Sequence, residues 1–210
     1  DMLAEQVTED GKTLEELLTV SSSDSNTDVE GQPRLNVNTA SKEEFTNRCG
    51  DVLTSREIDS IIQRRSSRQF TSPADLLQVR RLSRNKVAQI YDRLTTSAAE
   101  TREGVINLNT APPEVLAVLS TGMTDATVQA IVARRDEQGP FTDVGELLLI
   151  NSISTSLFRQ VAGQLTVRSR TFGVRSTGQT TDGISETVTC LLQVETDGGE
   201  TTTRTLYWRE

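Results

Sequence analysis

Seven basic side chains lie close together in this sequence and could neutralise phosphate groups. Residues 33–97 hold 12 basic and 7 acidic side chains, a net of +5, whereas the whole chain has a formal net charge of −8. Because phosphate-backbone binding depends on cationic surface, five of these arginines are candidate nucleic-acid contacts. The favoured alternative is that they solvate a helical surface and pair with acidic neighbours, as runs of surface charge usually do. The seven residues are Arg64, Arg65, Arg68, Arg80, Arg81, Arg84 and Lys86, and the five candidate contacts are Arg64, Arg65, Arg80, Arg81 and Arg84.

Residue types that commonly carry catalysis are scarce. The chain has no histidine, which removes the commonest general base and transition-metal ligand. Acidic turns at Asp182 and at Asp197 to Glu200 could hold calcium, but Asp-Gly pairs in hairpins are more often plain turns. We therefore expect no enzyme and no cofactor, with calcium as the alternative. The only two cysteines, Cys49 and Cys190, could form a disulfide or remain buried thiols, and their spacing does not decide between these states.

Two copies of one unit position most of these residues. The copies cover residues 35–94 and 106–163, and each has the composition of four or five short helices. Apolar positions that recur in both copies predict the core, namely Leu116, Ile131 and Leu147 in the second copy and Ile61 and Leu76 in the first. The matching stretches are Leu35–Ala40 with Ile106–Ala111, Ile61–Arg65 with Ile131–Arg135, and Phe70 and Leu76-Leu77 with Phe141 and Leu147-Leu148.

The end of the chain has a different pattern. From Leu165 onward, β-branched and polar residues alternate, which predicts half-buried strands at about Leu165–Ser176, Glu186–Glu195 and Thr201–Arg209. A change of parity in the first of these predicts a bulge near Ser169 or Arg170. The fold class is therefore α+β, with two tandem helical repeats followed by a small antiparallel sheet. The expected segments are an acidic lead-in with a short helix (1–32), the first repeat (33–99), the second repeat (104–163) and the strands (164–210).

The repeat resembles a known helical unit. Asn-hydrophobe-Asn-Thr-Ala, a helical hairpin, paired arginines and a phenylalanine before a leucine-rich helix are similar to the tandem helix-hairpin-helix unit, which also occurs as a SAM-like repeat. In nucleic-acid-binding members, Gly-hydrophobe-Gly hairpins direct backbone amides at a phosphate. None of the four hairpins here keeps both glycines. Asp51 and Asp125 would also lie near an incoming phosphate, so the pattern disfavours phosphate binding.

The order of the parts resembles a secretion family. An acidic lead-in with Gly11–Leu18, two SAM-like repeats and a short antiparallel sheet ending in Leu206–Glu210 look like general secretion pathway protein K, the large minor pseudopilin family of type II secretion systems. The resemblance implies a domain inserted into a pilin-type sheet and a preceding membrane helix. It also implies a bacterial cell envelope location, with inner-membrane anchoring and this domain in the periplasm.

That resemblance predicts a structural protein whose partners are other minor pseudopilins in a tip complex that starts pseudopilus assembly. Three strands cannot bury one face among themselves, so we expect partner contacts at Val188, Leu192, Leu206 and Trp208. The chain's own N-terminal helix is the alternative cover for this face. A DNA-binding helix-hairpin-helix protein of the competence type is the alternative function, and an adaptor for other protein partners is a third.

Overall fold

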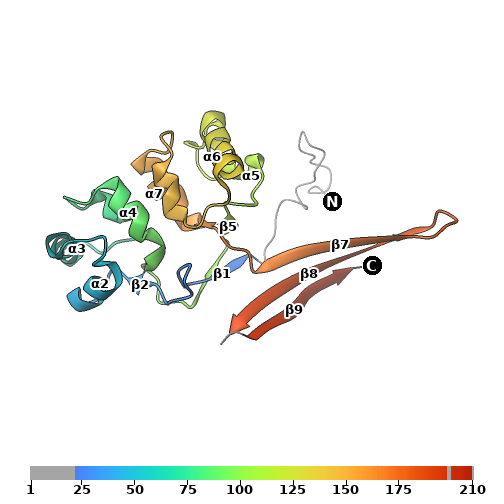
Figure 1. The fold of residues 1–210 in the computed structure, drawn as a ribbon, viewed down its shortest axis with the longest axis horizontal. Coiled ribbons are helices and arrows are strands. Elements are labelled where there is room, and N and C mark those ends of the chain that lie inside the picture. Colours follow the sequence, from blue (N-terminus) through green and yellow to red (C-terminus); the bar gives the residue numbers. More distant parts are fainter. Residues whose placement is uncertain (1–21, 198–199, 210) are drawn as a thin grey trace. The chain divides into compact units, whose positions relative to one another are not determined.

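The computed structural model describes residues 22–197 and 200–209 of the chain. It divides into two compact units (Figure 1): a helical unit, residues 25–167, and a sheet unit that holds residues 168–209 and residues 22–24 within the described part. Residues 22–32 contain no helix, and the rest of the lead-in for which a short helix was expected, residues 1–21, lies outside the described residues. The α+β fold class is confirmed, because helical repeats precede an antiparallel three-stranded sheet.

The helical unit contains both repeats, and each alternates α-helices with short 3-10 helices. The leucine-rich segment of each copy, expected as an ordinary helix, is a 3-10 helix. The first repeat contains α2 (Lys42–Cys49), α3 (Ser55–Ser67), η1 (Pro73–Gln78), α4 (Arg84–Ile90) and η2 (Tyr91–Arg93). The second contains α5 (Pro113–Ala117), α6 (Asp125–Gln138), η3 (Val144–Leu149), α7 (Thr155–Val161) and η4 (Ala162–Gln164).

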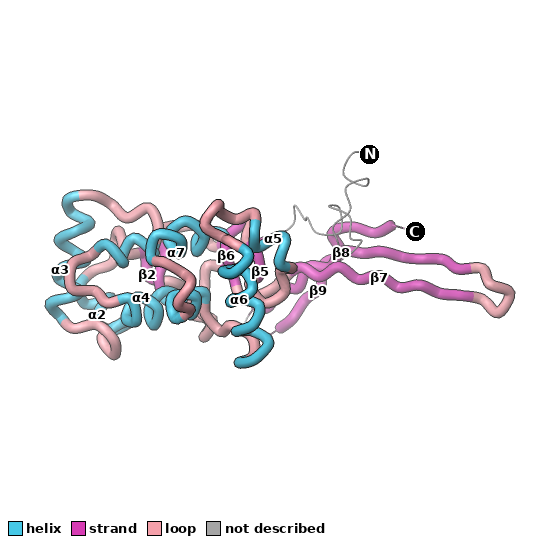
Figure 2. Tube along the Cα trace, turned by 90° about the horizontal axis from the view of Figure 1, so that it is seen from above, coloured by secondary structure: helices cyan, strands magenta, loops and turns pink. Residues whose placement is uncertain are grey.

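Short parallel strands close each repeat on itself. In the first repeat, β2 (Leu35–Asn36) pairs with β3 (Leu94–Thr95). In the second repeat, β5 (Ile106–Asn107) pairs with β6 (Leu165–Thr166), and Figure 2 shows these two segments side by side among the helices. The remaining short strands are β1 (Ser23–Ser25) and β4 (Thr101–Glu103). Each repeat therefore begins and ends at the same place, which explains why both copies open on a hydrophobe followed by asparagine.

The second asparagine of the repeated motif joins distant parts of each repeat. The Asn38 side chain donates to the Phe70 carbonyl at 2.9 Å and accepts from the Phe70 amide at 2.9 Å. Asn109 makes the same pair of bonds with Phe141, at 2.9 and 2.7 Å, and also donates to the Val167 carbonyl at 3.1 Å. Because these bonds satisfy backbone groups that have no helical partner, asparagine and phenylalanine recur together in both copies.

The predicted core is confirmed. Leu116, Ile131, Leu147, Ile61 and Leu76 each have 0% of their surface exposed. Val118, only two residues after Leu116, is not part of this core. The helix α5 ends at Ala117 and Val118 forms its C-cap, so the Val118 side chain is 82% exposed.

The two repeats pack on each other inside the helical unit. Helix α4 of the first repeat lies against η3 of the second, and Gly145 permits their close approach, since a Cβ there would lie 2.3 Å from the Ala88 carbonyl oxygen. A second contact has the repeats in the opposite roles: α7 of the second repeat lies against η1 of the first. There Arg159 donates to Asp75 with an Nη2–Oδ1 distance of 2.7 Å. The rings of Tyr91 and Phe158 pack edge to face, with their centroids 5.1 Å apart.

The sheet unit has the strand order β7-β8-β9, with both pairs antiparallel. Its strands are β7 (Thr171–Gln179), β8 (Ser185–Asp197) and β9 (Glu200–Arg209). The first residues of β8, Ser185 to Val188, pair with β7 alone. Figure 1 accordingly shows β7 and β8 continuing past β9 as a two-stranded ribbon.

The strand expected at Leu165–Ser176 is two strands. Leu165 and Thr166 form β6 in the helical unit, and the sheet strand β7 begins at Thr171. The bulge expected near Ser169 or Arg170 is therefore wrong, because the change of parity reflects a break between strands. A register shift does occur in the sheet, between Leu191 and Leu192 where β8 pairs with β9.

Candidate functional site

The four hairpins that could face a phosphate have their helix N-termini capped by their own side chains. Ser83, Thr124 and Ser154 each accept a hydrogen bond from the amide three residues later, at 3.3, 3.4 and 3.0 Å. At the N-cap of α3, the Thr54 amide donates to the Glu57 carboxylate at 2.8 Å. Hydroxyls at these positions satisfy amides at the helix start, and the carboxylate of Glu57 adds negative charge where an anion would bind.

Arg81 occupies the position of the first glycine in its hairpin. Its φ is +78°, and it is the non-glycine residue with positive φ among those the structure describes. A side chain in this conformation costs roughly 1–2 kcal/mol. The hairpin therefore keeps a backbone shape suited to glycine while carrying an exposed cation instead.

Most of the basic cluster has partners within the helical unit. Arg65 donates to the Val37 carbonyl at 3.0 Å, and Arg64 lies 5.9 Å from the centroid of the Phe70 ring. Arg84 donates to the carbonyls of Leu148 and Ile150 in the second repeat. Three of the five candidate nucleic-acid contacts therefore hold the fold together, and the exposed members of the cluster are Arg68, Arg80 and Arg81.

Lys86 of the same cluster forms an ion pair with Glu57, at 2.7 Å between Nζ and Oε2. The hydrogen bonds from Lys86 and from the Thr54 amide lower the pKa of Glu57 to about 2. The favoured expectation, that cations of this cluster meet acidic neighbours, holds for this residue. Asp51, the acidic residue of the first hairpin, pairs with Arg93 at 2.7 Å.

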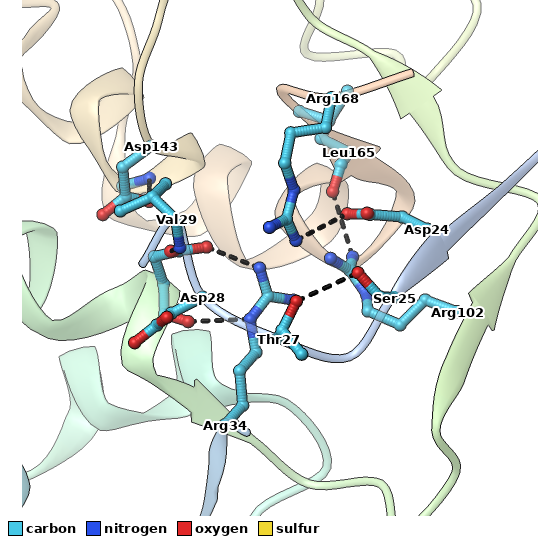
Figure 3. Close-up of polar contacts among 12 residues, drawn as sticks. Asp24, Ser25, Thr27, Asp28, Val29, Arg34, Arg102, Asp143, Leu165 and Arg168 are labelled. Atoms are coloured by element: carbon cyan, nitrogen blue, oxygen red, sulfur yellow. Dashed lines mark hydrogen bonds and ion pairs between the residues drawn. The ribbon is translucent and has the colours of Figure 1, made fainter. Parts of the chain in front are cut away.

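Buried ion pairs fix the loop that precedes the first repeat. Arg34 pairs with the buried Asp92 at 2.5 Å, and the Val29 amide donates to the same carboxylate at 2.6 Å. Nearby, Asp143 caps η3 by accepting from the Gly145 amide at 2.6 Å. Burial raises the pKa of Asp143 to about 7, and the charge of Asp92 acts in the same direction. Figure 3 shows Asp143, Val29 and Arg34 in this region.

Two further arginines have internal partners, one in each unit. Arg102 donates to the Gly163 and Leu165 carbonyls at 3.2 and 3.0 Å. In the sheet unit, Arg168 pairs with the buried Asp24 at 3.2 Å. Figure 3 shows both contacts, with Arg102 directed at the Leu165 carbonyl and Arg168 at Asp24.

One face of the sheet is apolar. The register places Val174, Cys190 and Trp208 in one row across the three strands. Val188 and Leu192 share the Cys190 face of β8 by strand alternation, and Phe172 stands opposite Leu192. We name Phe172, Val174, Val188, Leu192 and Trp208 the apolar sheet face.

Parts of this face are open to solvent. Phe172, Val174 and Trp208 are 45%, 43% and 58% exposed, whereas Val188, Leu192 and Leu206 are half-buried. Phe172 and Val174 were not among the expected contacts, although their shared parity in the sequence was the signal that could have found them. Leu206 lies at the register shift, since Tyr207 pairs with Leu191 and Thr205 pairs with Leu192.

The described residues contain no group of three His, Cys, Asp or Glu residues arranged to hold a metal ion. Asp182 lies in the turn after β7, where a hydrogen bond from Thr180 lowers its pKa, and the turn at Asp197 to Glu200 lies partly outside the described residues. Cys49 and Cys190 are buried free thiols, and burial raises the pKa of Cys49 to about 11. Within the described part of the chain, no helix combines the length and apolar character needed to cross a bilayer.

Comparison with known proteins identifies a motif in the second repeat. Residues 102–166 match the helix-hairpin-helix motif family. A curated relative, the endonuclease/exonuclease/phosphatase family domain-containing protein 1 of Xenopus laevis, is 29% identical over 168 residues. This alignment covers 70% of the chain and 30% of that relative, so the chain spans less than a third of the relative's length. No solved structure matches the chain.

Proposed function

We propose that this chain is the periplasmic domain of a type II secretion minor pseudopilin, which binds other pseudopilins in a tip complex that starts pseudopilus assembly. The observation that carries the proposal is the apolar sheet face. A three-stranded sheet is marginal without a packing partner, and exposed contiguous apolar surface commonly marks an interaction site. Trp208 and Phe172 have the aromatic side chains that are enriched at interface hot spots.

The chemistry of the chain supports an interaction role over catalysis. The commonest general base is missing, because the sequence has no histidine. The buried charges have structural partners, as Arg34 does in Asp92 and Arg168 does in Asp24. The partners we propose are pilin-fold proteins whose apolar helices cover the sheet face, and association would require no nucleotide or nucleic acid.

Co-expression with pilin-like proteins encoded nearby, followed by size-exclusion chromatography, tests this proposal. We expect a stable heteromeric complex that Trp208→Ala weakens by about tenfold or more, equivalent to roughly 1.4 kcal/mol of binding free energy. Ile184→Ala is the matched control, because Ile184 is 66% exposed in the turn between β7 and β8. Failure to co-elute with any of these proteins, when each is shown to be folded, would refute the proposal and leave an adaptor role.

DNA binding is the second candidate, favoured by the helix-hairpin-helix match over residues 102–166 and by the name of the curated relative. The capped hairpins and the internal partners of Arg64, Arg65 and Arg84 argue against it. We therefore expect at most weak, salt-dependent association through Arg80 and Arg81.

A fluorescence anisotropy titration with duplex DNA at about 0.15 M salt distinguishes the two functions. Submicromolar affinity that is lost in the double variant Arg80→Glu, Arg81→Glu would favour DNA binding over the pseudopilin role. The control is Arg56→Glu, which changes an exposed arginine on α3 outside the basic cluster. Equal losses in both variants would indicate a non-specific effect of net charge.

A further inference from the structure

The second repeat has a surface groove between α6 and η3. Its volume is about 290 Å³. Its apolar lining comes from Ala130 and Ala133 of α6 and from Leu149 and Ile150 at the end of η3, and its polar lining residues are Arg134, Glu137, Gln138 and Glu146. Leu149 is 62% exposed. A large aliphatic side chain that is this exposed, beside small residues that leave a hollow, forms an apolar surface without internal cover.

The first repeat is an internal control for this groove, because it has the same fold. Aligning the two copies places Ser60, Gln63 and Gln78 at the positions of Ala130, Ala133 and Leu149. The first repeat therefore folds with polar side chains at every one of these positions. The fold of the repeat is therefore compatible with polar residues at these three positions, whereas the fourth apolar lining residue, Ile150, corresponds to the buried Val79.

The two repeats also differ in charge at the end of α6. Asp136 and Glu137 are exposed acidic residues at the end of α6, where the first repeat has Ser66 and Ser67. Glu137 lines the groove and Asp136 lies next to it in the sequence, so acidic groups adjoin the apolar part of the lining, and the first repeat has serines at these two positions.

The cation that lines the groove is already engaged. Arg134 pairs with Glu146, donates to the Gly139 carbonyl at 2.6 Å and lies 4.1 Å from the centroid of the Phe141 ring. In the first repeat, the carboxylate that corresponds to Glu146 is Asp75, and it receives Arg159 of helix α7. Arg134 fills the corresponding place in the second repeat, so the acidic side chains that are exposed beside the groove are Asp136 and Glu137.

We propose that the groove binds a basic amphipathic helix of a partner protein. An apolar side chain of that helix would lie beside Leu149, and its Lys or Arg residues would face Asp136 and Glu137. Ala130, Ala133 and Glu137 are spaced i, i+3 and i+7 on α6, so they follow one face over about two turns. Small side chains there allow a second helix to approach closely, and helix-in-groove recognition uses this spacing of anchors. This surface lies on the helical unit and does not depend on the sheet-face proposal.

A labelled peptide of leucine and lysine, about 14 residues long so that it can form a helix, is the probe. Its anisotropy is titrated with the whole chain at about 0.15 M salt, beside a peptide in which glutamate replaces lysine. We expect saturable binding of the lysine peptide alone. The double variant Ala133→Gln, Leu149→Gln should bind about tenfold more weakly or worse, a loss of roughly 1.4 kcal/mol. Asp136→Ser, Glu137→Ser should weaken binding and reduce its salt dependence.

These substitutions install the residues of the first repeat, which that copy tolerates, and far-UV circular dichroism verifies the fold. Val118→Gln is the matched control, because Val118 is 82% exposed in the same repeat but does not line the groove. The proposal is overturned if the lysine peptide does not bind at millimolar concentration, or if the groove and control variants bind it equally. It is also overturned if the free chain self-associates and Leu149→Gln abolishes this, since the occupant would then be a second copy.

Discussion

Replacing Asn109 by alanine should destabilise the helical unit by about 3 kcal/mol. The Asn109 amide accepts from the Phe141 amide at 2.7 Å and donates to the Phe141 and Val167 carbonyls at 2.9 and 3.1 Å. Each such bond contributes about 1 kcal/mol net, and each lost partner leaves a buried backbone group unsatisfied. Asn38 makes two of the three bonds, both with Phe70, so Asn38→Ala should cost about 2 kcal/mol.

Urea unfolding followed by far-UV circular dichroism measures both effects in the helical unit. Fluorescence is unsuitable, because the one tryptophan, Trp208, lies in the sheet. Asn47→Ala is the control, since Asn47 is exposed on α2 and its replacement should change stability by about 0.5 kcal/mol or less. If Asn38→Ala cost as much as Asn109→Ala, or both matched the control, these bonds would not be the reason that the motif recurs.

Three further perturbations test the packing and the charges. Gly145→Ala should lower the free energy of unfolding by about 1–3 kcal/mol in a denaturant melt, because its Cβ would lie 2.3 Å from the Ala88 carbonyl oxygen. Gly163→Ala is the control and should be nearly neutral, because a Cβ there would have no atom within 4 Å. Leu116→Ala should cost about 2–5 kcal/mol, because Leu116 is fully buried, and a loss under about 0.5 kcal/mol would contradict the alignment of the repeats. Asp143 has its folded pKa raised to about 7, so the folded state retains a proton that the unfolded state releases near pH 4. The free energy of unfolding should therefore fall as pH rises from about 4 to 7. Asp143→Asn should flatten this profile and be more stable than wild type at about pH 8 by up to roughly 4 kcal/mol, which is about 1.4 kcal/mol for each unit of the pKa difference. Parallel profiles would refute the assignment.

Much of the helical unit could be predicted because its sequence repeats. Apolar residues that recur at matched positions, such as Ile61 with Ile131 and Leu76 with Leu147, are fully buried in both copies. The bonds from Asn38 to Phe70 could not be predicted from periodicity, because they link a side chain to backbone groups 32 residues away. The joint recurrence of asparagine and phenylalanine was the available signal.

The sheet was harder to predict at its beginning than at its end. Alternation located β8 and β9, but a continuous β-like pattern from Leu165 to Ser176 concealed the boundary between the two units. Thr166 pairs with Asn107 in a two-residue parallel strand, and such a long-range pairing leaves no local signature.

The function of the arginines was also not readable from composition. Arg65 and Arg84 resemble Arg80 and Arg81 in the sequence, yet the first two donate to backbone carbonyls and the last two are exposed. Whether a cation finds an internal acceptor depends on tertiary packing. The net charge of a segment therefore overstates the cationic surface available to a partner.

The ion pair between Asp24 and Arg168 bears on how many repeats the chain can hold. These residues directly flank the helical unit, residues 25–167, and their side chains meet at 3.2 Å. The chain therefore leaves the sheet unit and returns to it at one point, as at the base of a loop. Since the entropy of closing a loop grows only with the logarithm of its length, duplicating a repeat between these two residues would add little to that cost. A further copy of the repeat inserted between these two residues should therefore leave the register of the strands outside unchanged.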